Sequence, residues 1–176
     1  MSIPEDELVR AISDGDRVAF QRLVERFGPA LYRAACRLVG EGEADDVVQE
    51  GLTKAYIALR DGRFTKREGG TLEAWLKRIV VRTALDSLRA RKRRRVREVA
   101  HETCTPEVAS ARLALRELEV LLDALPSSQR VALVLKEVEG MSVREIAAAM
   151  DCSEGAVEQR LVRGRAALRA RRGDDV

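Results

Sequence analysis

Apolar positions recur at steps of three and four residues along most of the chain, the spacing that places side chains on one face of an α-helix. Between Leu8 and Val39 this pattern is interrupted at 14–16 and at Gly28-Pro29, so it predicts two or three short helices. A longer helix is predicted over 44–59, with an apolar side made of Val47, Val48, Leu52, Ala55, Tyr56 and Leu59.

The remainder of the chain continues the helical pattern with recognisable stops. Residues 61–70 contain three glycines and predict a loop, after which Thr71 is suited to cap a helix that runs into a basic block. From residue 96 to Thr105-Pro106 the pattern lapses, as expected of a linker. Further helices are predicted over 108–125, 127–139, 142–150 and 154–170.

These elements predict an all-α fold of two small helical domains joined by a flexible linker. The 176 residues are 45% apolar, enough to fill the cores of two such domains, whereas aromatic residues make up only 3% and argue against a β-sandwich or barrel. We place the first domain at 1–95, the linker at 96–106 and the second domain at 107–176.

Charge is segregated along the chain, although the formal net charge is only +3. Residues 41–50 hold five acidic and no basic residues, whereas seven of the nine residues in 89–97 are Arg or Lys. Six more arginines lie in 160–172. Two basic blocks suggest two surfaces for a polyanion, and the acidic block suggests a basic protein partner.

Other classes of protein fit the sequence poorly. No apolar run reaches the roughly 18 residues that span a bilayer, and the N-terminus is acidic, so a cytoplasmic protein without direct membrane insertion is expected. Asp45 and Asp46 are adjacent on a helix and diverge by about 100°, so they cannot converge on a metal ion or a scissile bond. We expect no enzyme activity, cofactor or metal; the residues considered for metal or redox roles are His101, Cys36, Cys104 and Cys152, and the sequence supports neither role.

The most specific pattern lies near the C-terminus. Ser142 and Glu145 have the spacing of a capping box that opens a short helix, and Asp151, a residue type tolerant of the left-handed region, begins a tight turn before a longer arginine-rich helix. A short helix, a turn and a basic helix predict a helix-turn-helix, whose second helix enters the DNA major groove. The alternative is an ordinary helical hairpin with solvated arginines.

Several runs in their observed order resemble the extracytoplasmic-function sigma factors. In the C-terminal half they are 125–130, 140–142, 146–152, 155–157 and 160–165, and in the N-terminal half they are 45–50, 75–81 and 84–89. The resemblance implies a sigma factor that directs promoter-specific transcription initiation and is controlled by an anti-sigma factor, itself often membrane-anchored. It implies as partners the RNA polymerase core, through the clamp helices of the largest subunit and the flap of the second largest, and promoter DNA, both duplex and melted.

The resemblance also implies three sets of site residues. The residues implied in polymerase binding lie on an acidic helix face: Asp45, Asp46, Val47, Gln49 and Glu50. Without the resemblance, this face would be interpreted as one that contacts only solvent. The residues implied in binding the minus-ten element, including a flipped base and the melted strand, are Phe64, Thr71, Trp75, Lys77, Arg78, Arg82, Asp86 and Arg89. The minus-thirty-five element falls to Ser153, Glu158, Gln159, Val162, Arg163 and Arg165.

Some features of these sets leave alternatives open. Trp75 also lies on the apolar stripe of its helix, so it is equally well interpreted as a core residue. The loop over 61–70 is about two residues longer than is common in the family, and Arg82 stands where Asn is frequent, so the base preference at the minus-ten element is not predicted.

A freestanding helix-turn-helix repressor or activator is the rival function, and an enzyme acting on nucleic acid is a more distant alternative.

Overall fold

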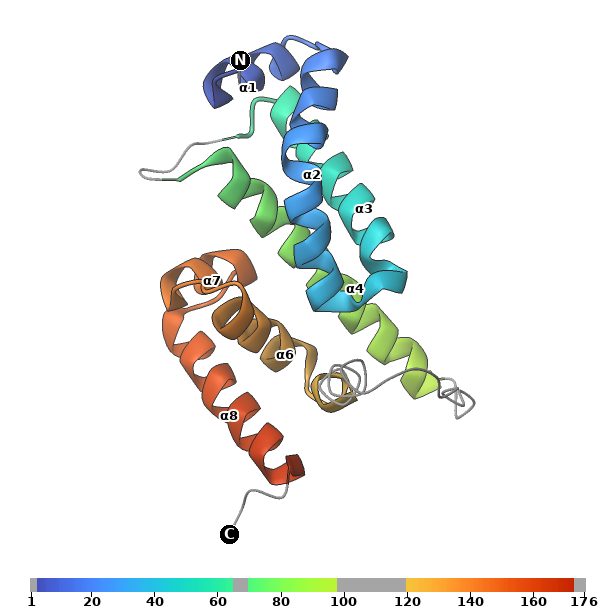
Figure 1. Ribbon diagram of the computed structural model, residues 1–176, viewed down its shortest axis with the longest axis vertical. Coiled ribbons are helices and arrows are strands. Elements are labelled where there is room, and N and C mark those ends of the chain that lie inside the picture. Colours follow the sequence, from blue (N-terminus) through green and yellow to red (C-terminus); the bar gives the residue numbers. More distant parts are fainter. Residues whose placement is uncertain (1–2, 65–69, 98–119, 173–176) are drawn as a thin grey trace. The chain divides into compact units, whose positions relative to one another are not determined.

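A computed structural model describes residues 3–64, 70–97 and 120–172 (Figure 1). Within these ranges the chain is helical and contains no strand. It divides into two units, residues 1–84 and 85–176. The predicted all-α class, with two helical domains and a C-terminal helix-turn-helix, is confirmed.

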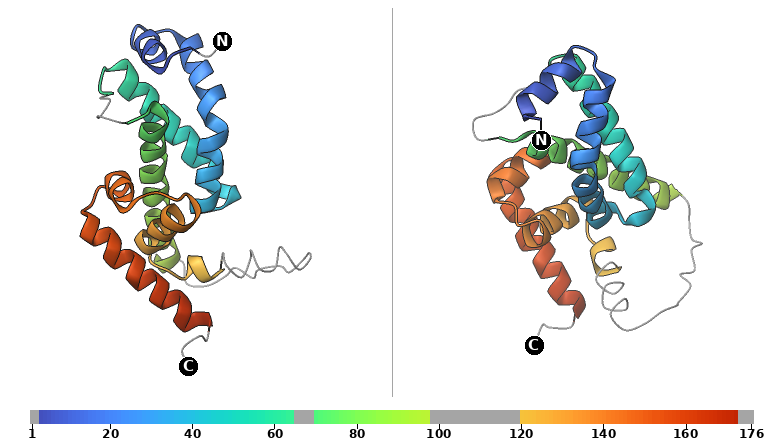
Figure 2. Two further views of the ribbon diagram at one scale, coloured as in Figure 1. Left: turned by 60° about the vertical axis from the view of Figure 1, so that its left-hand side comes forward. Right: turned by 45° about the horizontal axis from the view of Figure 1, so that its top comes forward.

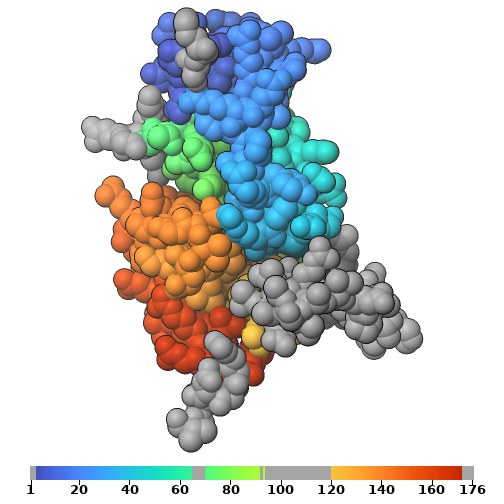
Figure 3. Space-filling model, viewed as in Figure 1, coloured from blue at the N-terminus to red at the C-terminus, as the bar shows by residue number. Residues whose placement is uncertain are grey.

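The first unit is built from α1 (Glu5–Ser13), α2 (Arg17–Val39), α3 (Glu41–Arg60) and the first part of α4 (Leu72–Arg97). Helices α2 and α3 lie side by side in all the ribbon views, and α1 packs against both (Figures 1 and 2). The space-filling view shows the long surface that α2 contributes, coloured in successive blues (Figure 3). The core between the helices includes Ile12, Leu23, Leu31, Leu38, Leu59, Leu72 and Leu76, each at most 1% exposed.

Local chemistry explains where these helices begin and end. The Asp16 carboxylate accepts hydrogen bonds from the backbone N–H groups of Val18 (2.8 Å) and Ala19 (3.2 Å), so it caps α2. Gly40, with φ of 86°, separates α2 from α3 in a conformation that side chains disfavour. The break expected at Gly28-Pro29 does not occur, because α2 continues through Pro29. Pro29 is exposed while Phe27 and Leu31 are buried, so packing on the opposite side holds the helix together.

A glycine allows α3 and α4 to pack closely. A Cβ atom at Gly51 would lie 3.0 Å from Val80 Cγ2, closer than side chains normally approach. Beside this crossing, Lys54 Nζ donates a hydrogen bond to Thr83 Oγ1 (3.2 Å) and forms an ion pair with Glu50 (2.6 Å). The crossing therefore fixes α4 against the helix that carries the acidic face.

The second unit contains the end of α4, α6 (Ser127–Leu133), a π-helix η1 (Val134–Val138), α7 (Val143–Met150) and α8 (Glu154–Arg172). The predicted capping box is present, because Ser142 Oγ accepts from Glu145 N–H (3.2 Å) and the Glu145 carboxylate accepts from Ser142 N–H (2.8 Å). Asp151 adopts the left-handed conformation (φ 54°, ψ 56°) and turns the chain from α7 into α8, as predicted.

Two features of this unit fix α8 against α6 and η1. A Cβ atom at Gly164 would lie 2.8 Å from Leu133 Cδ1, so α8 and α6 pack more closely there than any other residue type allows without a shift. The π-helix was not predicted from the sequence, which gave one regular helix over 127–139. It carries Glu137, whose Oε1 accepts hydrogen bonds from Arg165 Nε (3.2 Å) and Nη2 (2.6 Å).

The predicted domain boundaries remain predictions. Helix α4 extends to Arg97, two residues past the predicted end of the first domain at residue 95, and residues 98–106 lie outside the described residues. The helix predicted over 108–125 also lies outside them as far as residue 119, and 120–123 are helical.

Candidate functional site

An acidic face lies on α3, toward its N-terminus. Asp45, Asp46, Gln49 and Glu50 are all exposed, as the helical period predicts. The assignment of Val47 to the polymerase-binding face must be corrected. Val47 is 2% exposed and belongs to the core, because its position on the helix points toward the packed side. It can support the acidic face from below but cannot contact a partner.

An apolar groove continues this face and was missed in the sequence. Leu52 and Tyr56 were predicted to point inward, but both are half-buried and line a groove of about 550 Å³ between α2 and α3. Phe20 lies across from Tyr56 with ring centroids 4.8 Å apart. The other lining residues are Arg17, Val24, Gln49 and Thr53. Gln49 thus belongs both to the acidic face and to the groove.

A second candidate surface runs along α4. At about 100° per residue, Trp75, Arg78, Arg82, Asp86 and Arg89 fall within one sector of this helix. Together with Thr71 they form a strip about 27 Å long at 1.5 Å per residue. Lys77 differs from the predicted set, because its position is on the opposite side of α4 and its side chain is half-buried. We call the strip without Lys77 the α4 strip.

An aromatic pair and a capped helix end stand at the start of the α4 strip. Phe64 and Trp75 are both half-buried, and their rings meet edge to face with centroids 5.0 Å apart. Thr71 Oγ1 accepts from Ala74 N–H (3.1 Å), which confirms Thr71 as a cap. Trp75 is therefore neither a fully buried core residue nor a freely exposed one.

Helix α8, the second helix of the helix-turn-helix, has two distinct faces. Val157 and Leu161 are buried and pack within the helix-turn-helix, whereas Glu158, Gln159 and Arg163 are exposed and Val162 is 64% exposed. An exposed apolar side chain among polar ones suits contact with a thymine methyl group. The predicted base-reading positions thus share one accessible face.

Two residues of the predicted minus-thirty-five set already have structural tasks. Ser153 Oγ accepts from Ala156 N–H (3.2 Å) and caps α8. Arg165 makes the two hydrogen bonds to Glu137 described above. Arg160 of α8 also has a structural contact, because it donates a hydrogen bond to Cys152 Sγ (2.8 Å) in the turn before the helix.

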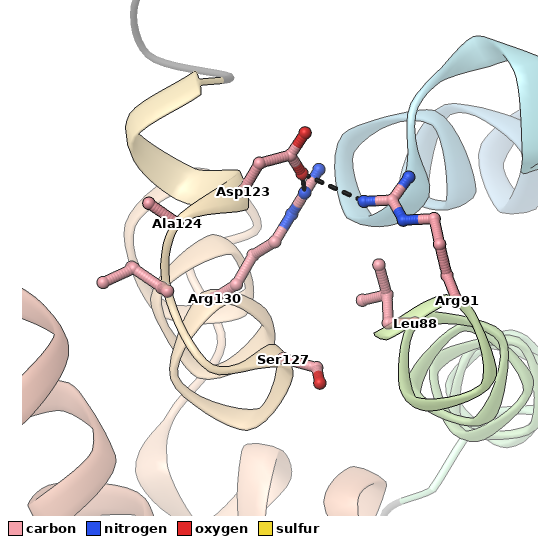
Figure 4. A pocket seen from close by; sticks show the side chains of 7 residues that line it. Leu88, Arg91, Asp123, Ala124, Ser127 and Arg130 are labelled. Carbon is pink, nitrogen blue, oxygen red and sulfur yellow. Dashed lines mark hydrogen bonds and ion pairs between the residues drawn. The ribbon is translucent and has the colours of Figure 1, made fainter. Parts of the chain in front are cut away.

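The second unit also contains a small polar pocket around a buried arginine (Figure 4). Arg130 is 5% exposed, pairs with Asp123, and has a buried Nε without a hydrogen-bond partner. Arg91 Nη2 lies 3.0 Å from the same Asp123 oxygen. Both guanidinium groups pair with this carboxylate, and because Arg130 is buried it is a structural residue rather than a DNA contact.

The described residues hold no cluster of His, Cys, Asp and Glu that could bind a metal ion. Cys36 and Cys152 are free, and the hydrogen bond between the side chains of Tyr32 and Cys36 raises the pKa of Tyr32. His101 and Cys104 lie outside the described residues. Across the same described ranges, no helix is long and apolar enough to cross a membrane.

Comparison with known proteins bears on both units. The family model of sigma-70 region 2 matches residues 23–94, and that of sigma-70 region 4 matches residues 115–168. The ECF RNA polymerase sigma-E factor of Escherichia coli is 33% identical over 94% of this chain and 93% of its own length. The chain belongs to the ECF sigma factor family. The RNA polymerase sigma-H factor of Pseudomonas aeruginosa is also 33% identical to this sigma factor, over 93% and 91% of the two chains.

Two solved structures resemble this sigma factor over most of its length. One is CnrH, solved in complex with the cytosolic domain of CnrY, with 32% identity, a TM-score of 0.64 and coverage of 98% and 99% of the two chains. The other is RpoE from Bartonella quintana, solved in complex with the anti-sigma factor NepR, with 28% identity, a TM-score of 0.65 and coverage of 89% and 98%.

Proposed function

We propose that this sigma factor binds core RNA polymerase through α2 and α3, holds the melted minus-ten element on α4, and reads the minus-thirty-five element with α8. The observation that carries the proposal is the division of α8 into a buried packing face and an exposed face with Glu158, Gln159, Val162 and Arg163. Residues that contribute nothing to the core but share a face are available for recognition.

The polymerase surface combines charge with apolar area. Asp45, Asp46 and Glu50 offer negative charge to a basic partner, and the adjoining groove offers Leu52 and Tyr56. Because exposed ion pairs alone contribute little affinity, the groove supplies the desolvated contact that a stable complex needs. We assign this surface to the clamp helices of the largest subunit. The flap of the second largest subunit is assigned to the second unit, where Val138 is 57% exposed.

The α4 strip fits a single strand of DNA. Arg78, Arg82 and Arg89 provide cations along one side of the helix, and the Phe64–Trp75 pair provides an aromatic surface at its start. Cationic tracks that end on aromatic rings are the usual means of holding unpaired nucleotides, since stacking does not require a particular sequence. This arrangement supports capture of the strand that is exposed when the promoter opens.

The proposed base reading is tested with holoenzyme reconstituted from core polymerase. Gln159→Ala or Arg163→Ala should weaken open-complex formation by about 1 to 3 kcal/mol on the preferred minus-thirty-five sequence and much less on a scrambled one, because base-edge contacts vanish when the base is wrong. Arg169→Ala, an exposed position of the same helix, serves as the control and should lower both equally, since phosphate contacts are independent of sequence. Equal losses on both sequences for Gln159→Ala and Arg163→Ala would refute base reading by this face.

An anti-sigma partner is also proposed, because RpoE was solved with the anti-sigma factor NepR and CnrH with the cytosolic domain of CnrY. Such a partner would have to cover the acidic face and groove of α3 to keep polymerase away. If a membrane-protein gene adjoins the gene of this sigma factor, the purified cytosolic part of its product should inhibit transcription by this holoenzyme and leave the housekeeping holoenzyme unaffected. Inhibition of both enzymes alike would contradict a specific partnership.

A further inference from the structure

A hydrogen bond joins the first helix of the chain to the beginning of α4. Glu5 Oε2 accepts from the backbone N–H of Leu72 at 2.9 Å, although the two residues are 67 positions apart. Glu5 is the first residue of α1 and Leu72 is the first residue of α4. The bond therefore connects an element to which the resemblance assigns no role with the helix of the α4 strip.

The bond adds a second side-chain acceptor at the N-terminus of α4. The first N–H groups of any helix lack partners within that helix and need other acceptors. Thr71 accepts from Ala74, but Ala74 has no side chain that could reach back to the cap, as the Glu of a capping box does. Glu5 supplies an acceptor for a different N–H of the first turn, that of Leu72, and its position at the helix N-terminus suits a carboxylate.

Glu5 is held in place by the packing of its own helix. Leu8 is 3% exposed and Ile12 is fully buried, so α1 is anchored to α2 and α3. Arg26 of α2 adds a hydrogen bond to the carbonyl of Ile3 (3.1 Å), just before α1 begins. Because α1 is fixed at both points, its carboxylate presents a fixed acceptor to α4.

We propose that Glu5 is a positioning residue for the melted minus-ten strand, a role that rests on the proposed function of the α4 strip. Trp75 lies one turn after the cap, and its backbone N–H donates a hydrogen bond to the Thr71 carbonyl (3.2 Å). Its ring also meets Phe64 on the other side of the loop. When Glu5 holds the first turn, Trp75 and Phe64 are in place before DNA arrives.

Without this acceptor the first turn of α4 frays. A strand that needs the ordered turn then binds only the fraction of molecules in which the turn is formed, and its apparent affinity falls by that fraction. The expected loss of affinity follows from the free energy that a helix-capping hydrogen bond usually contributes. Removing such a bond corresponds to about 3- to 10-fold weaker binding.

The test uses reconstituted holoenzymes with full-length sigma factor. The probe is a fluorescein-labelled single-stranded 12-mer that wild-type holoenzyme selects from a randomised pool. Glu5→Ala should bind this 12-mer about 3- to 10-fold more weakly. Glu5→Gln keeps an acceptor oxygen and should bind within about twofold of wild type, as should the matched control Glu7→Ala at an exposed position of α1.

Two further measurements separate positioning from general loss of structure. Trp75 is the only tryptophan, so the fluorescence of the free chain reports its surroundings, and Glu5→Ala should shift its emission to longer wavelength while Glu5→Gln should not. Affinity for core polymerase should be unchanged in all variants. An unchanged 12-mer affinity in Glu5→Ala, or an equal loss of core affinity, would overturn the positioning role.

Failure of the proposed function of the α4 strip would give a different set of results. If wild-type holoenzyme selected no preferred 12-mer, the assignment of the α4 strip to the melted strand would be wrong, and a positioning role toward that strand would fall with it. In that case the Trp75 emission shift in Glu5→Ala would still show that Glu5 orders the start of α4, which distinguishes the two failures.

Discussion

Reversing the charges of Asp46 and Glu50 together is expected to abolish binding to core polymerase. Both side chains are exposed on α3, so Asp46→Lys with Glu50→Lys should leave the helix content intact. The partner surface is inferred to be basic, and like charges brought together in an interface cost several kcal/mol. We expect at least about 100-fold weaker association, or about 3 kcal/mol, measured by fluorescence anisotropy with labelled sigma factor.

The matched control carries the same change in net charge elsewhere. Glu7→Lys with Asp14→Lys alters two exposed acidic positions on and just after α1, neither of which lines the groove of Leu52 and Tyr56. Its core affinity should stay within about threefold of wild type, since distant exposed charges are screened at physiological salt. Full core affinity in the Asp46 and Glu50 variant would refute the docking surface.

The acidic face shows what a helical period can and cannot predict. The period correctly places Asp45, Asp46, Gln49 and Glu50 outward, because direction around a helix depends on local spacing alone. It fails for Leu52 and Tyr56, which line a groove although they fall on the apolar side. Whether an apolar side chain is covered depends on the neighbouring helix, and no local pattern contains that information.

Replacing Trp75 with alanine should damage promoter opening more than it damages the fold. Trp75 is half-buried at the start of the α4 strip, and loss of one stacked base costs about 1 to 3 kcal/mol, or about 5- to 150-fold in open-complex formation. A supercoiled template and potassium permanganate footprinting of unpaired thymines measure the opening directly. Closed-complex formation should change much less, because the minus-thirty-five contacts are untouched.

Leu76, the next residue along α4, provides the comparison. It is 1% exposed, so Leu76→Ala should lower the free energy of unfolding by about 2 to 5 kcal/mol through the cavity it leaves. Correctly folded Leu76→Ala protein should nevertheless open promoters normally when tested well below its melting temperature. If Trp75→Ala lost stability as Leu76→Ala does and still opened promoters, Trp75 would be a core residue, the alternative that its sequence position left open.

The helix caps also differ in whether the sequence could predict them, depending on whether the bonded residues are close in the sequence or brought together by the fold. The capping box of Ser142 and Glu145 and the left-handed Asp151 join residues close in sequence, and both were predictable. The bond from Leu72 to Glu5 spans 67 positions and exists only because α1 folds against α2 and α3. The π-helix over Val134–Val138 was unpredictable for a related reason, since nothing in its local sequence distinguishes it from an α-helix.

The two faces of α8 have a consequence for how promoter preference can diverge. Val157, Leu161 and Gly164 hold the helix to its unit, whereas Glu158, Gln159, Val162 and Arg163 contribute almost nothing to packing. Substitutions at such exposed positions usually change stability by less than about 0.5 kcal/mol. If α8 reads the minus-thirty-five element as proposed, a copy of this protein that arises by gene duplication can therefore acquire a new set of target genes without first acquiring stabilising mutations. The same independence makes α8 a suitable starting point for engineering transcription circuits that do not interfere with one another.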